Sequence, residues 1–464
     1  MASVSVTLGS MAFWQATAGK GCRSWISVRL RKVLAQADRA LRMCLKAVLI
    51  GAAAVSFIGP NALSAAPAVD AGFAQWLAQL WPEAQSRGIT RATFDMVTQG
   101  LQPDLSLPDL DLPGRRQTGS QAEFVQTPAQ YLKEASIERL AAQGRTQLAR
   151  HRASLSAIEK RFGVPAPIVL AIWARETNFG TATMPYSAMR ALATQAYLGR
   201  RKEQFRQELL EALLMLQEGS ATLAEMRSSW AGAMGQPQVL PSGFRKYAVD
   251  MDGDGRRDIW NSVPDALGTI ANHLVDIGWQ PDQRWAYEVH APENVDCRIA
   301  QPENKLPLRE WLKKGFVPAY QRKLGAEELA QEASLLMPAG LYGPAFLVTN
   351  NYFALKNYNF SDLYVLFVGH LADRIVDPRP FEQPWQTVEQ LPTQAMERMQ
   401  KVLTSRGFYK DKIDGKAGML TRSALGAYQG ANNLRIDCWP TQAVVDHMLK
   451  GGPTSPMPKG PARK

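Results

Sequence analysis

The chain has 464 residues, of which 46% are hydrophobic and 20% charged, and its formal net charge is +11. This balance is typical of a folded globular protein and excludes a disordered or collagen-like chain. The basic excess is uneven, because residues 1–66 hold eight Lys and Arg against one Asp. The body of the chain is close to neutral, which excludes a strongly basic domain of the kind that binds nucleic acid.

Residues 1–66 have the layout of an export signal. A basic stretch leads into an uncharged apolar run, residues 47–58, which Pro60 terminates before a group of small residues. This order is typical of a secretory signal, so we expect cleavage and a periplasmic location. The alternative is an uncleaved membrane anchor, since residues 47–69 carry no charge and about 20 residues span a bilayer. Met43, directly before the apolar run, would begin a more compact signal.

Cys297 and Cys438 are the two cysteines outside this leader. They lie far apart in the chain, and the sequence leaves open whether they form a disulfide. CxxC and HExxH patterns are both missing from the sequence, which argues against a zinc site.

Hydrophobic periodicity predicts a mainly α protein with few and short strands. A short helix at residues 73–84 precedes a loop rich in Pro, Asp and Leu at residues 101–117. Further helical patterns cover residues 131–162, 168–176, 187–197, 202–218, 264–277 and 363–375. A Pro-rich segment at residues 377–385 is typical of a semi-stiff linker. The predicted divisions are a leader (1–66), a main domain (67–384), a small C-terminal domain (385–452) and a disordered tail (453–464).

Glu176 ends the strongly apolar helix predicted at residues 168–176. A carboxylate at the C-terminal turn is unfavourable for the helix dipole, and partial burial would add to this effect. Both effects would raise the pKa of Glu176, so its carboxyl group could hold a proton near neutral pH and donate it. The alternative is a surface Glu that pairs with Arg175.

Four segments of the chain resemble those of a known family. Residues 171–180 read Ala-Ile-Trp-Ala-Arg-Glu-Thr-Asn-Phe-Gly. Residues 229–242 read Ser-Trp-Ala-Gly-Ala-Met-Gly-Gln-Pro-Gln-Val-Leu-Pro-Ser, and similar matches follow at residues 247–260 and 336–364. Together they resemble the B-type lytic murein transglycosylases, glycoside hydrolase family 103, which are lysozyme-like enzymes that cleave peptidoglycan. The resemblance implies a lysozyme-like α+β catalytic domain in which Glu176 is the single catalytic acid/base.

The resemblance also implies substrate-binding positions around that acid. These are Ser229, Gln238, Asn359, Tyr364 and, through an ungapped spacing, Tyr131. The chain departs from the family pattern at Ala174-Arg175 and Val239-Leu240, and His273 stands where a Tyr is usual.

A single carboxyl group suffices for the reaction that this resemblance implies. Protonated Glu176 would give its proton to the glycosidic oxygen that leaves MurNAc, and would then take a proton from the MurNAc C6 hydroxyl as that oxygen attacks C1. The product is a 1,6-anhydro end, and the reaction needs neither water nor a catalytic cofactor. Two alternatives stay open, a hydrolytic muramidase on the same scaffold and a non-catalytic scaffold that binds the cell wall.

An acidic loop at residues 250–261 fits the template of a calcium-binding loop, with Gly at its sixth position. The expected ligands are Asp250, Asp252, Asp254, the carbonyl of Arg256, Asp258 and, from the family pattern, Asp265. Asn261 replaces the usual bidentate Glu at the twelfth position, which would reduce affinity. We expect a structural Ca²⁺ here, and the alternative is a charged, Gly-rich surface turn.

The C-terminal domain resembles the peptidoglycan-binding type 1 domain, a small three-helix module. The residues that carry this resemblance are Met399-Gln-Lys-Val-Leu403, Gly407-Phe-Tyr409, Ile413-Asp-Gly-Lys-Ala-Gly418, Thr421-Arg-Ser-Ala424 and Tyr428-Gln429. The implied partner is therefore the glycan strands of peptidoglycan, without nucleic acid, and with a membrane only if the leader stays uncleaved. Such a module would raise the local concentration of the enzyme on its polymer.

Overall fold

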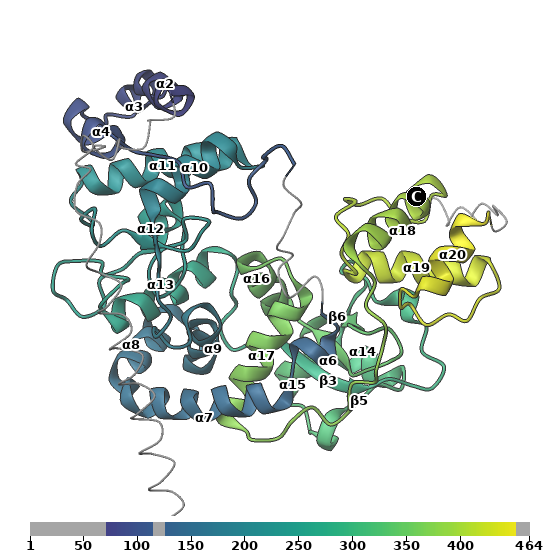
Figure 1. Cartoon of the computed structure of the whole chain (residues 1–464). Helices are drawn as coiled ribbons and strands as arrows, with labels where there is room; N and C mark the ends of the chain where they lie inside the picture. The colour runs from purple at the N-terminus through teal and green to yellow at the C-terminus, as the bar shows by residue number, and fades with distance from the viewer. Residues whose placement is uncertain (1–70, 115–125, 452–464) are drawn as a thin grey trace, which may run out of the picture. The chain divides into compact units, whose positions relative to one another are not determined.

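The computed structural model describes residues 71–114 and 126–451 (Figure 1). The predicted export signal at residues 1–66 and the predicted tail at residues 453–464 lie outside the described residues. None of the described helices combines the length and the apolar character that crossing a membrane requires.

Helices from the first half of the described chain form one packed group. It contains α2 (Ala71–Gln79), α3 (Trp81–Ser86), α4 (Arg91–Thr98), α10 (Ala188–Leu198), α11 (Lys202–Gln217) and α12 (Pro241–Tyr247). The helix predicted at residues 73–84 is in fact two helices, because Pro82 stands in the first turn of α3. Buried Phe73, Phe94 and Phe244 belong to a core that these helices share.

A second group of helices surrounds α9. It contains α6 (Pro128–Tyr131), α7 (Glu134–Arg150), α8 (Arg152–Phe162), α9 (Ala166–Thr177), α13 (Val263–Asp276), α16 (Asn350–Tyr358) and α17 (Asp362–Val376). The continuous helix predicted at residues 131–162 is wrong, because the chain leaves helical geometry at Leu132 (φ −98°, ψ 42°) and at His151 (φ −107°, ψ 22°). The ring of His151 packs edge-on against Trp173, with ring centres 5.8 Å apart. Tertiary packing therefore overrides a continuous helical pattern here.

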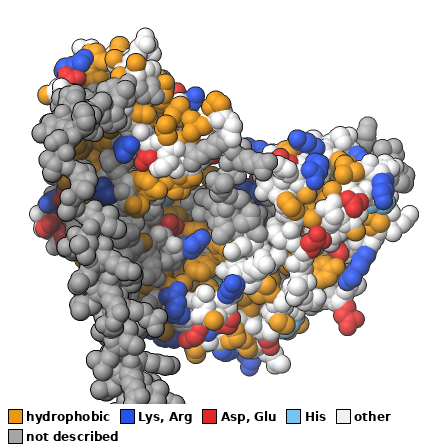
Figure 2. Space-filling model, in the orientation of Figure 1, with side chains coloured by type: hydrophobic (Ala, Val, Ile, Leu, Met, Phe, Trp, Pro, Cys, Tyr) orange, Lys and Arg blue, Asp and Glu red, His pale blue; other side chains and the backbone are white. Residues whose placement is uncertain are grey.

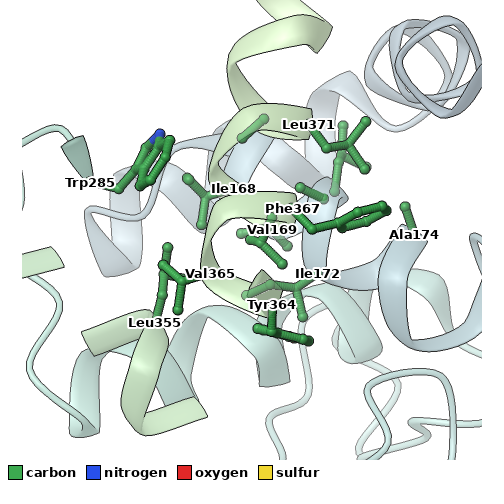
Figure 3. Packing of buried hydrophobic residues seen from close by; sticks show 14 of the residues in the cluster. Ile168, Val169, Ile172, Ala174, Trp285, Leu355, Tyr364, Val365, Phe367 and Leu371 are labelled. Atoms are coloured by element: carbon green, nitrogen blue, oxygen red, sulfur yellow. The ribbon is translucent and has the colours of Figure 1, made fainter. Parts of the chain in front are cut away.

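Helices α9 and α17 lie side by side and supply much of the core (Figures 1 and 3). Figure 3 shows Ile168, Val169 and Ile172 of α9 facing Val365 and Phe367 of α17. Fully burying an aliphatic side chain of this size stabilises a fold by about 1.5–3 kcal/mol. The contact therefore fixes the ends of both helices relative to each other, including Glu176 and the first turn of α17.

The strands are short, as the sequence predicts. One antiparallel sheet has the order β4-β6-β7-β3-β5, and it is built from β3 (Ala286–His290), β4 (Lys305–Pro307), β5 (Val317–Pro318), β6 (Glu332–Leu336) and β7 (Ala345–Val348). A separate two-residue ladder joins β1 (Tyr186–Ser187) to β2 (Arg227–Ser228). Short helical segments complete this part, namely η1 (Cys297–Ile299), α14 (Leu308–Lys313), η2 (Ala319–Gln321) and α15 (Ala326–Ala330).

The predicted C-terminal module has three helices, α18 (Thr393–Ser405), α19 (Met419–Ala431) and α20 (Gln442–Leu449), with a core of their own. A disulfide between Cys297 and Cys438 joins this module to the main domain across 141 residues of sequence. The pairing that the sequence left open is therefore present.

The segment predicted as a linker is also packed against the main domain. Phe381 stacks on the buried ring of His370, with ring centres 3.7 Å apart. A methyl group at Gly343 would approach the ring of Trp385 to 2.5 Å, so the two residues are in close contact. The Pro-rich chain thus follows the surface of the domain.

Candidate active site

Glu176 lies in the last turn of α9 and is half-buried. The helix begins after its N-cap Pro165, and Pro167 stands in its first turn, where the missing N–H of a proline would have no helical partner. It ends where its C-cap residue, Asn178, adopts a left-handed conformation with φ 48°. Among residue types, Asn accepts the left-handed conformation most readily after Gly. The apolar body of α9 therefore holds a carboxyl group at its carboxyl end.

Tyr364 contacts this carboxyl group directly. Its hydroxyl donates a hydrogen bond of 2.6 Å to Oε1 of Glu176. Tyr364 is 1% exposed, and burial, together with the negative charge of Glu176, raises the pKa of Tyr364 well above its ordinary value. The hydroxyl therefore stays protonated at neutral pH and remains a donor to Glu176.

Tyr358 is a site residue that the sequence analysis missed. Its ring stacks on Tyr364, with ring centres 6.4 Å apart and planes 8° from parallel, and its hydroxyl donates to the carbonyl of Pro237 over 3.0 Å. Burial and the charge of Glu176 raise the pKa of Tyr358 well above its ordinary value. Its position directly before Asn359, inside a segment used for the family resemblance, is the signal that could have identified it.

The loop that carries Ser229 and Gln238 is fixed to the last turn of α9 by Gln236. The indole N–H of Trp173 donates to Oε1 of Gln236 over 2.8 Å, and the hydroxyl of Thr177 donates to the Gln236 carbonyl over 3.0 Å. The sequence analysis did not single out Gln236 either. Both bonds hold this loop against the helix that ends at Glu176.

Ser229 and Gln238 shape this loop from within. The Ser229 hydroxyl accepts from the N–H of Ala233 over 3.2 Å. Gln238 has φ 54°, and its amide donates to the carbonyl of Gly235 over 2.9 Å. A non-glycine residue at positive φ is uncommon, and the side chain's bond to its own loop stabilises it. The structure therefore places both residues in the loop beside α9.

Asn359 lies between α16 and α17, and Tyr131 is the last residue of α6. Asn359 caps the carboxyl end of α16, and its Oδ1 accepts from the N–H of Ser361 over 3.2 Å, which turns the chain into α17. The Tyr131 hydroxyl accepts from Nη2 of Arg175 over 2.7 Å. The guanidinium group also lies over the ring of Tyr131, 5.3 Å from its centre. Arg175, which the sequence offered as an alternative partner for Glu176, therefore contacts Tyr131.

His273 lies between two tyrosine rings. Its ring centre is 4.1 Å from that of Tyr247 and 4.6 Å from that of Tyr358. Burial lowers the pKa of His273 to about 4, so its ring is neutral at neutral pH. An aromatic row therefore runs from Tyr247 through His273, Tyr358 and Tyr364 to Glu176.

The acidic loop gathers three of its predicted ligands. Asp250, Asp252 and Asp254 each offer a carboxylate oxygen, and these oxygens lie within 4.8 Å of one another. Oxygen atoms clustered in this way suit a hard cation such as Ca²⁺. Backbone N–H groups also donate to Asp250, from Gly253 over 2.6 Å and from Gly255 over 2.9 Å.

The other predicted ligands make bonds inside the loop or between the loop and neighbouring segments. Asp258 accepts from the N–H of Asn261 over 2.9 Å, and the side chain of Arg256 pairs with Glu225 at 3.3 Å. Asp265 is fully buried and accepts from the N–H groups of Met251 and Asp258, over 2.7 and 2.8 Å. Burial raises the pKa of Asp265. These bonds connect the loop to the first turn of α13.

The surface gives no sign of a large basic patch on the face that Figure 2 shows. Among the described residues drawn there, Lys and Arg side chains alternate with Asp and Glu. This mixture agrees with the near-neutral charge of the body.

Comparisons with known proteins agree with these observations. Residues 72–373 match the family model of the transglycosylase SLT domain, and residues 393–448 match that of a putative peptidoglycan binding domain. Over 216 residues, the chain is 32% identical to membrane-bound lytic murein transglycosylase B of Escherichia coli (strain K12). That match covers 46% of this chain and 58% of the relative, so it spans little more than half of the relative's length.

Two solved structures are also similar. SltB3 from Pseudomonas aeruginosa, in complex with NAG-NAM-pentapeptide, has 37% sequence identity and a TM-score of 0.74, covering 81% of this chain and 99% of its own. The soluble lytic transglycosylase SltB1 from Pseudomonas aeruginosa has 27% identity and a TM-score of 0.54, covering 66% of this chain and 99% of its own.

Proposed function

Because the chain belongs to the transglycosylase SLT domain family, we propose that it is a lytic transglycosylase that cleaves the MurNAc–GlcNAc β-1,4 bond of peptidoglycan and leaves 1,6-anhydro-MurNAc ends. The observation that carries this proposal is the half-buried carboxyl group of Glu176, which receives a 2.6 Å hydrogen bond from Tyr364. SltB3 structures with NAG-NAM-pentapeptide and NAG-anhNAM-pentapeptide support both the substrate class and the product class.

In the first step, Glu176 acts as a general acid. Its proton moves to the glycosidic oxygen as the bond from that oxygen to C1 of MurNAc breaks, which leaves Glu176 as a carboxylate. The Tyr364 hydroxyl is bound to Oε1, so we assign the moving proton to Oε2. The hydrogen bond from Tyr364 then stabilises the charge that develops on the carboxylate.

In the second step, Glu176 acts as a base. The C6 hydroxyl of MurNAc attacks C1 and gives its proton to the carboxylate, which restores the starting enzyme. The neutral side chains of Ser229, Gln238 and Asn359 lie on segments packed around α9, where they would orient the sugar. No water is consumed and no cofactor takes part in this scheme.

The C-terminal module would bind the same polymer and hold the enzyme on it, acting in the periplasm after export. The acidic loop would hold a structural Ca²⁺ through Asp250, Asp252 and Asp254. A cation there would neutralise three neighbouring carboxylates and so stabilise the loop ahead of α13. Raising the Ca²⁺ concentration should increase the melting temperature of the wild type, and Asp252→Asn should reduce that increase.

Mass spectrometry of digested sacculi tests the reaction. We expect anhydro-muropeptides from the wild type and none from Glu176→Gln. Glu159→Gln, an exposed substitution on α8, is the matched control and should keep full activity. Reducing MurNAc ends would instead indicate a hydrolytic muramidase, and an absence of products from the wild type would indicate a non-catalytic scaffold. Full activity in Glu176→Gln would refute the assignment of the acid.

A further inference from the structure

A buried ion pair joins the C-terminal module to the start of α17. Arg422 on α19 donates from Nη2 to Oδ2 of Asp362 over 3.0 Å, and the two side chains are only 6% and 7% exposed. Arg422 also donates from Nη1 to the carbonyl of Ala417 inside its own module. Burying two charges carries a large desolvation cost. A module that served only as a flexible tether would not require such a contact.

Asp362 is the first residue of α17, and side chains from α16 and α19 bind its carboxylate. Its Oδ1 accepts from the hydroxyl of Tyr352 over 2.6 Å and from the ammonium group of Lys356. Although burial opposes it, the charges of Lys356 and Arg422 hold the pKa of Asp362 well below its ordinary value. The carboxylate therefore stays ionised, which also suits its place at the amino end of a helix.

The same turn of α17 carries Tyr364. Ser361 caps the helix by accepting from the N–H of Tyr364 over 3.3 Å, and Tyr364 in turn contacts Glu176. A shift of Asp362 would therefore move the hydroxyl that binds the catalytic carboxyl group.

Other bonds keep the module in place next to this turn. The Cys297–Cys438 disulfide joins the two parts covalently. The Ser423 hydroxyl donates to the carbonyl of Arg298 over 2.7 Å and accepts from the amide of Gln301 over 2.6 Å. Arg422 is thus presented to Asp362 by a docked module.

We propose that Arg422 is a positioning residue for the reaction, through which the docked C-terminal module holds the first turn of α17 and so sets the Tyr364–Glu176 contact. This proposal rests on the proposed role of Glu176. It gives the module a second task besides binding the polymer. The two tasks differ in what they affect, because a tether changes the affinity for long strands, whereas positioning changes kcat on any substrate.

The test measures kcat and KM of the full chain on a short, soluble MurNAc–GlcNAc oligomer, too small to contact the module and Glu176 together. Because misplacement by about 1 Å can cost about 10²-fold in rate, we expect Arg422→Gln to lower kcat by roughly 10- to 100-fold while KM changes little. Arg422→Lys keeps the charge and should recover part of the loss. Arg406→Gln is the matched control, since Arg406 bonds to Tyr428 and Met448 within the module.

The pH profile of kcat gives a readout that reduced stability alone would not move. The titratable and charged groups that interact with Glu176 or with its partner Tyr364 are Tyr358 on α16, Tyr364 on α17 and Arg175 on α9. Arg422→Gln leaves all three in place. A weakened bond from Tyr364 would raise the pKa of Glu176 and move the alkaline limb of the profile to higher pH.

Wild-type kcat for Arg422→Gln on the short oligomer, with an unmoved pH profile, would overturn the proposal even if binding to sacculi weakened. Circular dichroism and thermal unfolding check that the variants fold. If Arg422→Gln does not fold, the kinetic comparison is made with Arg422→Lys instead. Glu176→Gln is assayed in parallel. Activity in Glu176→Gln would overturn the proposed function, whereas an inactive Glu176→Gln beside a fully active Arg422→Gln would overturn the positioning role alone.

Discussion

Replacing Tyr364 by Phe removes one oxygen atom and leaves the packing of the ring between α9 and α17 in place. The lost group is the donor of the 2.6 Å hydrogen bond to Oε1 of Glu176. Hydrogen bonds to charged groups contribute about 1.5–3 kcal/mol. At about 1.4 kcal/mol per tenfold change, the loss should lower kcat by roughly 10- to 100-fold if the bond forms fully only with the carboxylate.

The same substitution should change the pH dependence. The bond from Tyr364 favours the charged form of Glu176, so its removal raises the pKa of that carboxyl group. Since Glu176 must be protonated to begin the proposed reaction, activity should fall as pH rises through this pKa. The alkaline limb of kcat against pH should therefore move upward in Tyr364→Phe.

The assay is the rate of release of anhydro-muropeptides from a soluble glycan between about pH 4 and 9. Tyr409→Phe, a buried tyrosine in the C-terminal module that donates to the carbonyl of Lys412, is the matched control. If Tyr364→Phe kept the wild-type kcat and the wild-type alkaline limb, the contact in the structure would have no role in the chemistry.

Three further results are expected. Gln236→Leu should lower the free energy of unfolding by about 1–3 kcal/mol in urea titrations, because the buried indole N–H of Trp173 loses its acceptor; an unchanged midpoint would contradict this. Replacing both Cys297 and Cys438 by Ser should cost about 2–5 kcal/mol, and equal stability of the two proteins would show that the link contributes nothing. His273 has its pKa lowered to about 4 in the folded protein, so stability is fully present above its ordinary value of 6.5 and falls as pH drops toward 4. His273→Phe should make the melting temperature less sensitive to acid over that interval, and identical slopes for the two proteins would exclude His273 as the cause.

The sequence predicts best where one local pattern dominates. The apolar run of α9 and the position of Glu176 at its end could both be read directly, since a helix without a polar face must be buried. The three helices of the C-terminal module agree with what the family resemblance of that segment implied. Here local preference and tertiary structure agree.

Where packing decides, the sequence is a weaker guide. Neither Gly nor Pro marks the break at His151, whose geometry accompanies a contact with Trp173. Tyr358 reaches the site through a ring contact and a bond to Pro237, 121 residues earlier, which spacing cannot show. The disulfide spans 141 residues, and a separation of that size carries no information about distance in space.

The link between Cys297 and Cys438 also bears on when the protein becomes complete. Disulfides form and persist outside the reducing cytoplasm, so under the proposed export this bond would close once both cysteines had left that compartment. Until then, Arg422 is held against Asp362 by noncovalent contacts alone. Under the proposed export, the covalent link between the module and the main domain would therefore form only in the compartment of the proposed substrate.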